Sequence, residues 1–258
     1  MKAITSVQNP AVKEARALAD ARGRAAQNAF LLDGEHMVQE AFGICPGLVR
    51  AVFVREDCAD AYAALLKSAA CECFAVPARV MEAVTQVKTP QGIAAVCGMP
   101  PPAATPAMGD KLVLAENVQD PGNIGTILRT LDAAGFHGLI LTPGCADPFG
   151  PKALRASMGS ALRVPIFRAE SAPSAVEALN GLGWATLASA LDGEDFYRRD
   201  PLPRRVCLLV GNEGAGLRPE TVRACTHRFR LPMRGGAESL NAAVAAGVFM
   251  YEIINRAE

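Results

Sequence analysis

The stretch CGMPPPAATPAMGD at residues 97–110 constrains the fold more than any other part of the sequence. Four prolines lie among small residues, and such a chain continues neither a helix nor a central strand. This composition predicts a semi-rigid linker, which we place at 99–109. The linker divides the 258 residues into an N-terminal domain of 1–98 and a C-terminal domain of 110–258, both of ordinary domain size.

Short apolar runs alternate with helical patterns on both sides of this linker. In the N-terminal domain, LVRAVFVRE and GIAAVC are typical of strands, and NPAVKEARALADAR is typical of a helix with Asn9 as its N-cap. The C-terminal domain has about six strand-like runs and a closing helix, SLNAAVAAGVFMYEIINR. Strands that alternate with helices predict an α/β fold, with a parallel or mixed sheet covered by helices.

Charge and hydropathy restrict the partners of the chain. No apolar run reaches the roughly 18–20 residues of a membrane span. The polar start MKAITSVQNP lacks the apolar core of a signal peptide, so we expect a cytoplasmic protein with no membrane partner. The formal net charge is zero, which argues against nucleic-acid binding through overall charge. The segments 1–24, 150–168 and 218–234 are locally basic, however, and favour phosphate contact.

Several enzyme classes find no support in the motifs. The eight cysteines form no paired C-x-x-C set and the three histidines stand far apart, so we expect no metal site. There is no G-x-S-x-G elbow, although a triad assembled in space stays open. Gly211, Gly214 and Gly216 give G-x-x-G-x-G, which is not the G-x-G-x-x-G order of dinucleotide-dependent oxidoreductases.

Polar, glycine-containing loops follow three of the predicted strands. They read ENVQDPGNIG after Leu114, GNEGAGL after Val210 and PMRGGAESLN after Leu231. Ligands of open α/β sheets bind beyond the carboxyl ends of the strands, so these loops predict a binding site. A structural interpretation stands beside this one, because Asn123 and Ser239 are candidate N-caps of the helices that follow.

The three loops together resemble a known family. NVQDPGNIGTILRTLDAAGF, LLVGNEGAGL and LPMRGGAESLNAAVAAGVFMYE resemble the three ordered motifs of the SpoU (TrmH-like) branch of the SPOUT RNA 2′-O-ribose methyltransferases, over residues 111–256. LRASMGSALRVPIF resembles the stretch between the first two motifs. In the N-terminal domain, ITSVQNPAVKEARAL, FLLDGEHMVQEA and KTPQGIAAV resemble the SpoU substrate-binding domain more weakly, with Asp33 where that pattern has Glu.

This resemblance implies a fold and an activity. The C-terminal domain would be a parallel-sheet α/β domain with a deep trefoil knot, and the N-terminal domain a smaller α/β unit akin to certain ribosomal proteins. The protein would be a homodimer that transfers a methyl group from S-adenosylmethionine to a ribose 2′-hydroxyl of structured RNA. Ribosomal RNA is the favoured substrate. The alternatives are a transfer RNA 2′-O-methyltransferase and a non-catalytic RNA-binding protein of the same fold.

The resemblance also assigns roles to residues of the three motifs. The catalytic set comprises Asn123, Arg129, Glu213, Ser239 and Asn241. The cofactor-binding set comprises Leu187, Ser189, Gly211, Asn212, Leu231, Met233 and Leu240. From the locally basic segments we expect RNA contacts by Arg22, Arg24, Lys152 and Arg155.

Methyl transfer from a sulfonium is an in-line displacement that needs no metal. Arg129 lies on a helix otherwise rich in Ile, Leu and Ala, where a guanidinium needs an anionic partner. Because a guanidinium stays protonated, with a pKa above about 12, we interpret Arg129 as a phosphate clamp rather than a base. The proton of the hydroxyl would then leave to water or to Glu213. We also expect that deletion of residues 1–96 leaves a folded, cofactor-binding dimer with weaker RNA affinity.

Overall fold

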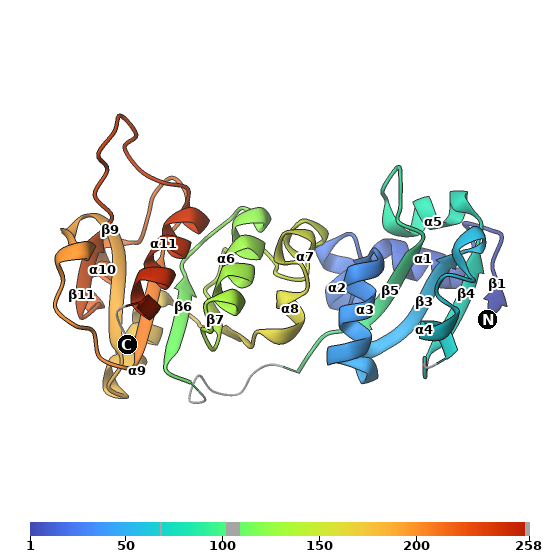
Figure 1. Ribbon diagram of the computed structural model, residues 1–258, viewed down its shortest axis with the longest axis horizontal. Helices are drawn as coiled ribbons and strands as arrows, with labels where there is room; N and C mark the ends of the chain where they lie inside the picture. The colour runs from blue at the N-terminus through green and yellow to red at the C-terminus, as the bar shows by residue number, and fades with distance from the viewer. Residues whose placement is uncertain (68, 102–108, 256–258) are drawn as a thin grey trace. The chain divides into compact units, whose positions relative to one another are not determined.

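The computed structural model describes residues 1–67, 69–101 and 109–255, so most of the linker predicted at 99–109 lies outside the described residues. The chain forms two compact units (Figure 1). The first unit comprises Met1–Pro101 and Phe149–Leu162, and the second comprises the described residues of Pro102–Pro148 and Arg163–Glu258.

The first unit contains a mixed five-stranded sheet. Its strands, in the order β1-β4-β3-β5-β2, are β1 (Lys2–Ala3), β4 (Glu72–Val76), β3 (Val49–Arg55), β5 (Ile93–Gly98) and β2 (Ala29–Asp33). β4 pairs in parallel with β1 and β3, whereas β5 is antiparallel to β2 and β3. The prediction of an α/β unit with a parallel or mixed sheet is therefore confirmed.

Helices and short turns connect these strands. They are α1 (Pro10–Ala17), α2 (Ala21–Gln27), α3 (Glu35–Ile44), η1 (Pro46–Leu48), η2 (Glu56–Cys58), α4 (Ala63–Lys67) and α5 (Ala78–Thr85). α1 begins as predicted, because the Asn9 side chain accepts a hydrogen bond from the backbone nitrogen of Ala11 at 2.9 Å. Val12 of α1 and Val80 of α5 pack on Phe53 of β3 in one buried core.

A segment from the second half of the sequence completes this unit. α7 (Pro151–Ser157) packs against β2, and the Phe149 ring lies 4.9 Å from the ring of Phe30. Phe149 and Leu154 are both buried. α8 (Ser160–Arg163) follows directly. The core of the first unit is therefore built from two stretches of sequence that are far apart.

The second unit contains a six-stranded sheet in which every neighbouring pair is parallel. Its strands, in the order β11-β9-β10-β6-β7-β8, are β11 (His227–Arg230), β9 (Ala185–Asp195), β10 (Val206–Val210), β6 (Lys111–Ala115), β7 (Leu139–Leu141) and β8 (Ile166–Arg168). The prediction of a parallel sheet of about six strands is confirmed. β10 is buried along its whole length, as expected for a central strand covered on both faces.

Helices cover this sheet, as predicted. They are α6 (Pro121–Ala133), α9 (Ala172–Gly181), α10 (Pro219–Ala224) and α11 (Ala242–Asn255), with a 3-10 turn η3 (Phe196–Arg198) after β9. Leu112 and Leu114 of β6 share a core with Val176 of α9. α11 packs against β10 and α6. None of the described helices is long and apolar enough to cross a membrane.

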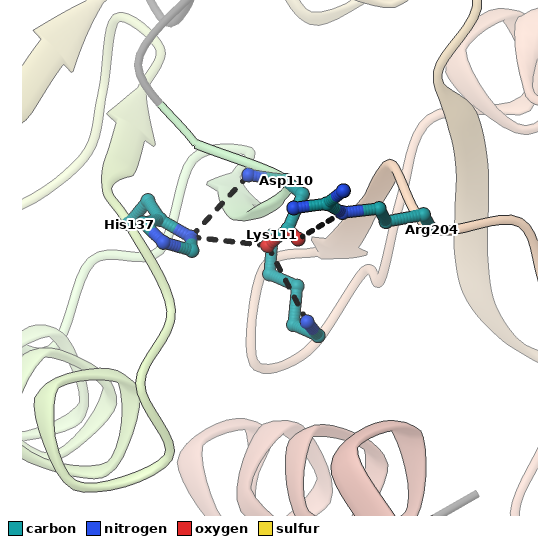
Figure 2. A network of polar contacts seen from close by, with 4 residues as sticks. All are labelled: Asp110, Lys111, His137 and Arg204. Atoms are coloured by element: carbon teal, nitrogen blue, oxygen red, sulfur yellow. Dashed lines mark hydrogen bonds and ion pairs between the residues drawn. The ribbon is translucent and has the colours of Figure 1, made fainter. Parts of the chain in front are cut away.

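A polar network joins the segments that precede β6, β7 and β10 in this unit (Figure 2). The Asp110 carboxylate, just before β6, accepts hydrogen bonds from Lys111 Nζ at 3.3 Å and Arg204 Nε at 3.0 Å. His137 Nδ1, just before β7, lies 3.4 Å from the same carboxylate. Burial raises the pKa of Asp110, but hydrogen bonds from Arg204 and Lys111 outweigh it, so the pKa lies below its ordinary value.

Candidate functional site

The three polar loops all begin at carboxyl ends of strands in the second unit. The first loop follows β6, the second follows β10, which is the neighbour of β6 in the sheet, and the third follows β11. The third loop, residues 231–241, forms neither helix nor strand before α11 (Figure 1). Parallel strands end at the same edge of a sheet, so the fold brings Asn123 of the first loop beside residues that lie 90 and 118 positions further along the chain.

A chain of hydrogen bonds joins the three loops. Asn241 Nδ2 donates to Asn123 Oδ1 at 2.9 Å, and Asn123 Nδ2 donates to Glu213 Oε1 at 2.9 Å. One member comes from each loop. Three residues that the sequence assigned to a single site are therefore in direct contact.

The Glu213 carboxylate is the centre of this arrangement. It also accepts hydrogen bonds from the backbone nitrogens of Gln119, at 3.1 Å, and Asp120, at 2.9 Å. Partial burial raises its pKa, but the hydrogen bonds from Asn123 and the Asp120 backbone outweigh burial, and the pKa lies below its ordinary value. Glu213 is therefore ionised at neutral pH and closes the first loop onto the second.

The two helix caps differ from those predicted. Asp120, not Asn123, caps α6, because its carboxylate accepts from the backbone nitrogens of Gly122 and Asn123. Asn241, not Ser239, caps α11 through Ala243 N at 2.9 Å and Val244 N at 3.2 Å. Both predictions for the caps were wrong. In each loop a neighbouring Asx side chain takes the cap, which leaves Asn123 to bridge and Ser239 exposed.

The second loop folds back on itself. Asn212 Oδ1 accepts from Gly214 N and Ala215 N, both at 3.0 Å, while Asn212 Nδ2 donates to the Asn117 carbonyl at 2.9 Å. A Cβ at Gly211 would lie 2.1 Å from the carbonyl carbon of Gly216, so only glycine permits this closure. Glycine is thus required at position 211 because the loop closely approaches its own backbone there.

These loops surround a cavity of about 160 Å³ that is open on one side. Predicted site residues on its wall are Ser189, Gly211, Asn212, Glu213, Leu231, Met233, Ser239 and Leu240. The wall also contains Ala190, Leu191, Val210, Gly214, Gly216, Arg230, Ala242, Ala245 and Phe249. Leu187 is fully buried inside β9 and does not line the cavity. Of the two candidates in ATLASAL, only Ser189 lines the cavity.

The lining suits a ligand with an apolar part and several polar groups. Leu231, Leu240 and Phe249 supply apolar surface, whereas Ser189, Asn212 and Ser239 supply hydrogen-bonding groups. The open side leaves room for a ligand larger than the cavity. Among the described residues, no cluster of histidine, cysteine, aspartate or glutamate is arranged to hold a metal ion.

The sequence interpretation missed one buried carboxylate at the beginning of the first loop. Glu116, at the end of β6, is 3% exposed and accepts from Arg218 N at 2.9 Å and Thr221 Oγ1 at 2.7 Å. These contacts hold the beginning of α10, directly after the glycine loop. An acidic residue immediately after the apolar run LVLA was the signal, since a buried carboxylate requires such partners.

Arg129 stands apart from these contacts. It is exposed on α6, six residues after Asn123, and within the described part of the chain it has no ion-pair partner. Its guanidinium is therefore available to an external anion, as the sequence interpretation required.

The residues expected to contact RNA belong to the first unit. Arg22 on α2 and Lys152 and Arg155 on α7 are exposed. Arg24 is 5% exposed, and its guanidinium donates to the carbonyls of Leu18 at 2.9 Å and Ala19 at 2.8 Å. This buried arginine supports the turn between α1 and α2 and has no free surface for a phosphate, so we exclude it from the RNA contacts.

The fold and site define a class of protein: a two-unit α/β protein that binds a ligand in strand-end loops of a parallel sheet. Sequence profiles agree with this class. That of the SpoU rRNA Methylase family matches residues 110–251, and that of the MRM3-like substrate binding domain matches residues 9–95. The chain belongs to the SpoU family.

Individual relatives match nearly the whole chain. The 23S rRNA (guanosine(2553)-2′-O)-methyltransferase RlmP of Bacillus subtilis (strain 168) is 37% identical over 256 residues, which cover 98% of this chain and 99% of the relative. An AdoMet-bound rRNA methyltransferase structure from Sinorhizobium meliloti is 32% identical, with a TM-score of 0.87 over 98% of this chain and 97% of that one. The SpoU methyltransferase AviRb from Streptomyces viridochromogenes, in complex with AdoMet, has a TM-score of 0.85 at 29% identity, over 97% of this chain and 98% of that one.

Proposed function

We propose that this protein transfers the methyl group of S-adenosylmethionine to a ribose 2′-hydroxyl of ribosomal RNA. The observation that carries the proposal is the chain Asn241–Asn123–Glu213, which joins all three motif loops beside one cavity. The family membership and the names of the full-length relatives support the cofactor and the reaction.

Different residues of the cavity wall would bind different parts of the cofactor. Leu231, Leu240 and Phe249 would hold the adenine ring, and the polar groups of Ser189 and Asn212 would meet the ribose and amino-acid parts of the cofactor. The bound sulfonium supplies an electrophilic methyl group. The Asn241–Asn123–Glu213 chain fixes the loops before the ligand arrives, which reduces the ordering cost of binding.

Arg129 would hold the substrate strand. Its exposed guanidinium, which pairs with none of the described residues, can form bidentate hydrogen bonds to a phosphate and place the neighbouring ribose. Alignment of the 2′-oxygen with the methyl group can contribute several kcal/mol by itself. Glu213 is a poor proton acceptor because its pKa is lowered, so we assign the departing proton to water.

Ribosomal RNA is favoured over transfer RNA by how much of the chain the relatives match. RlmP and the Sinorhizobium meliloti rRNA methyltransferase each match 98% of the chain. The A. aeolicus TrmH/SpoU tRNA modifying enzyme matches 58% of it, with a TM-score of 0.52. The first unit, which would select the RNA, therefore has its counterpart in ribosomal RNA enzymes.

A homodimer and a deep trefoil knot also belong to the proposal. α11 presents two large exposed side chains, Val244 at 51% and Tyr251 at 46% exposure, beside the helix α6 that carries Arg129. Exposed apolar side chains grouped on one helix suit a subunit interface. Sedimentation equilibrium should give twice the chain mass, and a monomer at micromolar concentration would contradict the dimer.

Two measurements test the function. Isothermal titration with S-adenosylmethionine should show one site per chain, whereas a non-catalytic RNA-binding protein of the same fold should show no heat of binding. Transfer of a labelled methyl group to ribosomal RNA should then fall on the order of 10²- to 10³-fold in Arg129→Ala, with cofactor affinity retained. Wild-type transfer by this variant would remove Arg129 from the mechanism.

A further inference from the structure

The wall of the cavity contains two charged side chains, Glu213 and Arg230, among the described residues that line it. These two side chains differ in their hydrogen-bond partners. The Glu213 carboxylate already accepts hydrogen bonds from Asn123 and from two backbone nitrogens. Its charge is therefore compensated within the protein, and a ligand gains little by approaching it.

Arg230 has no such partner in the part of the chain that the structure describes. It is the last residue of β11, at the carboxyl end of the sheet, and its neighbour Leu231 lines the same cavity. Its side chain is exposed, and across the described ranges it makes no ion pair and no side-chain hydrogen bond. The preceding arginine of the strand, Arg228, is instead paired with Asp192 at 3.0 Å.

An unpaired guanidinium on the wall of a binding cavity indicates a ligand with an anionic group nearby. S-adenosylmethionine carries one such group, the carboxylate of its methionine part. Its ammonium and sulfonium groups are cationic and would avoid Arg230. The charges of the wall therefore set a direction for the bound cofactor, with its carboxylate toward β11.

We propose that Arg230 binds the carboxylate of S-adenosylmethionine and so fixes the orientation of the methionine part in the cavity. This inference rests on the proposed function, since it assumes that cofactor. Arg230 is not among the catalytic and cofactor-binding residues that were assigned from the sequence. The pair would be a charge-assisted hydrogen bond, and Arg230 would act in binding rather than in the displacement itself.

The test compares two ligands by isothermal titration of the full-length protein. Wild type should bind S-adenosylmethionine about tenfold more tightly than decarboxylated S-adenosylmethionine, which lacks only the carboxylate. Arg230→Gln should lose about tenfold affinity for S-adenosylmethionine and keep its affinity for the decarboxylated compound, so that the two become equal. Arg230→Lys, which keeps the charge, should recover part of the preference.

Arg228→Gln is the matched control, because it removes another exposed arginine of the same strand, whose partner is Asp192. It should leave both affinities unchanged. Equal losses for both ligands in Arg230→Gln, or an unchanged preference, would overturn the inference. So would a variant whose cofactor affinity is intact but whose KM for RNA rises, since Arg230 would then contact a phosphate. Failure of wild type to bind either ligand would instead contradict the proposed function.

Discussion

Glu213 is the residue on which the geometry of the site depends most. Its carboxylate joins the first and second loops through Asn123 and the backbone of Gln119 and Asp120. A general base works best with a pKa near the operating pH, whereas the hydrogen bonds to Glu213 lower its pKa. The sequence interpretation left open whether this carboxylate accepts the proton, and the contacts favour a structural clasp.

Glu213→Gln separates a clasp from a base. The amide keeps one acceptor oxygen but presents hydrogen atoms to the donors around it, so the loops should separate. We expect the Kd for S-adenosylmethionine to rise at least about fivefold, by isothermal titration. A base would behave differently. If the variant binds the cofactor normally and the rate of transfer falls and loses its dependence on pH, Glu213 is the proton acceptor.

At the scale of elements, Asn241 performs two tasks at the beginning of α11. Its oxygen caps the helix through Ala243 and Val244, and its nitrogen donates to Asn123. Asn241→Asp keeps the cap and loses the donor. The free energy of unfolding, measured in urea, should lie within about 0.5 kcal/mol of the wild-type value. The rate of methyl transfer should fall tenfold or more.

Asn241→Ala is the companion variant, since it loses both the helix cap and the hydrogen bond to Asn123. It should cost about 1 kcal/mol of stability, the usual loss for a missing cap, in addition to the loss of activity. Full activity in Asn241→Asp would show that the contact with Asn123 has no part in the site.

The network at the opposite edge of the sheet gives a prediction that depends on pH (Figure 2). Asp110 is paired with Lys111 and Arg204, and its pKa is lowered in the folded state. A carboxylate of this kind stabilises the fold above its unfolded pKa of about 3.9, and the gain disappears as the pH falls through the lower folded value.

Asp110→Asn should therefore lower the free energy of unfolding by about 0.5–1 kcal/mol at pH 7. The urea unfolding curves of variant and wild type should converge as the pH falls below about 4. Asp192→Asn removes a more exposed pair and should change little at either pH. A difference for Asp110→Asn that persists at the lowest pH would assign the effect to packing rather than charge.

The elements themselves were largely predictable from local pattern. The central strands β6, β7 and β10 coincide with apolar runs, since a buried parallel strand needs a continuous one. The edge strand β11, His227–Arg230, is instead mostly polar and exposed. The caps of helices α6 and α11 were not predictable. At the beginning of α11, for example, Glu238, Ser239 and Asn241 are polar candidates within four residues, and tertiary contacts decide among them. Part of the cavity wall was predicted, because residues such as Gly211 and Leu231 follow strand ends, whereas Phe249 on α11 was not. Leu187 lies two residues before Ser189 in β9 and is buried within the sheet.

At the scale of the whole molecule, the packing of residues 149–162 could not be read from sequence. This stretch lies between β7 and β8, yet Phe149 and Leu154 are buried in the first unit against β2. Long-range packing of this kind leaves no local period. It also changes the expectation for deletion of residues 1–96, because that variant would expose the apolar surface of Phe149 and Leu154 and should be poorly soluble.

Phe149→Ala tests this packing in the full-length protein. Loss of a buried phenylalanine typically costs about 3–5 kcal/mol, so the first unit should lose much of its stability. Hydrogen exchange should quicken in β2, beside Phe30, and the parallel sheet of the second unit should retain its protection. Leu182→Ala, at a site 60% exposed, is the control and should leave β2 protected. Unchanged protection of β2 in Phe149→Ala would contradict the assignment of this segment to the first unit.

The most direct test of the proposed function is a map of ribose methylation in total RNA from cells with and without this protein. We predict that one ribose in ribosomal RNA loses its 2′-O-methyl group when the protein is absent. Wild-type protein should restore that group, and Arg129→Ala should not. An unchanged ribosomal pattern in cells that lack the protein, or a change confined to transfer RNA, would contradict the proposed substrate.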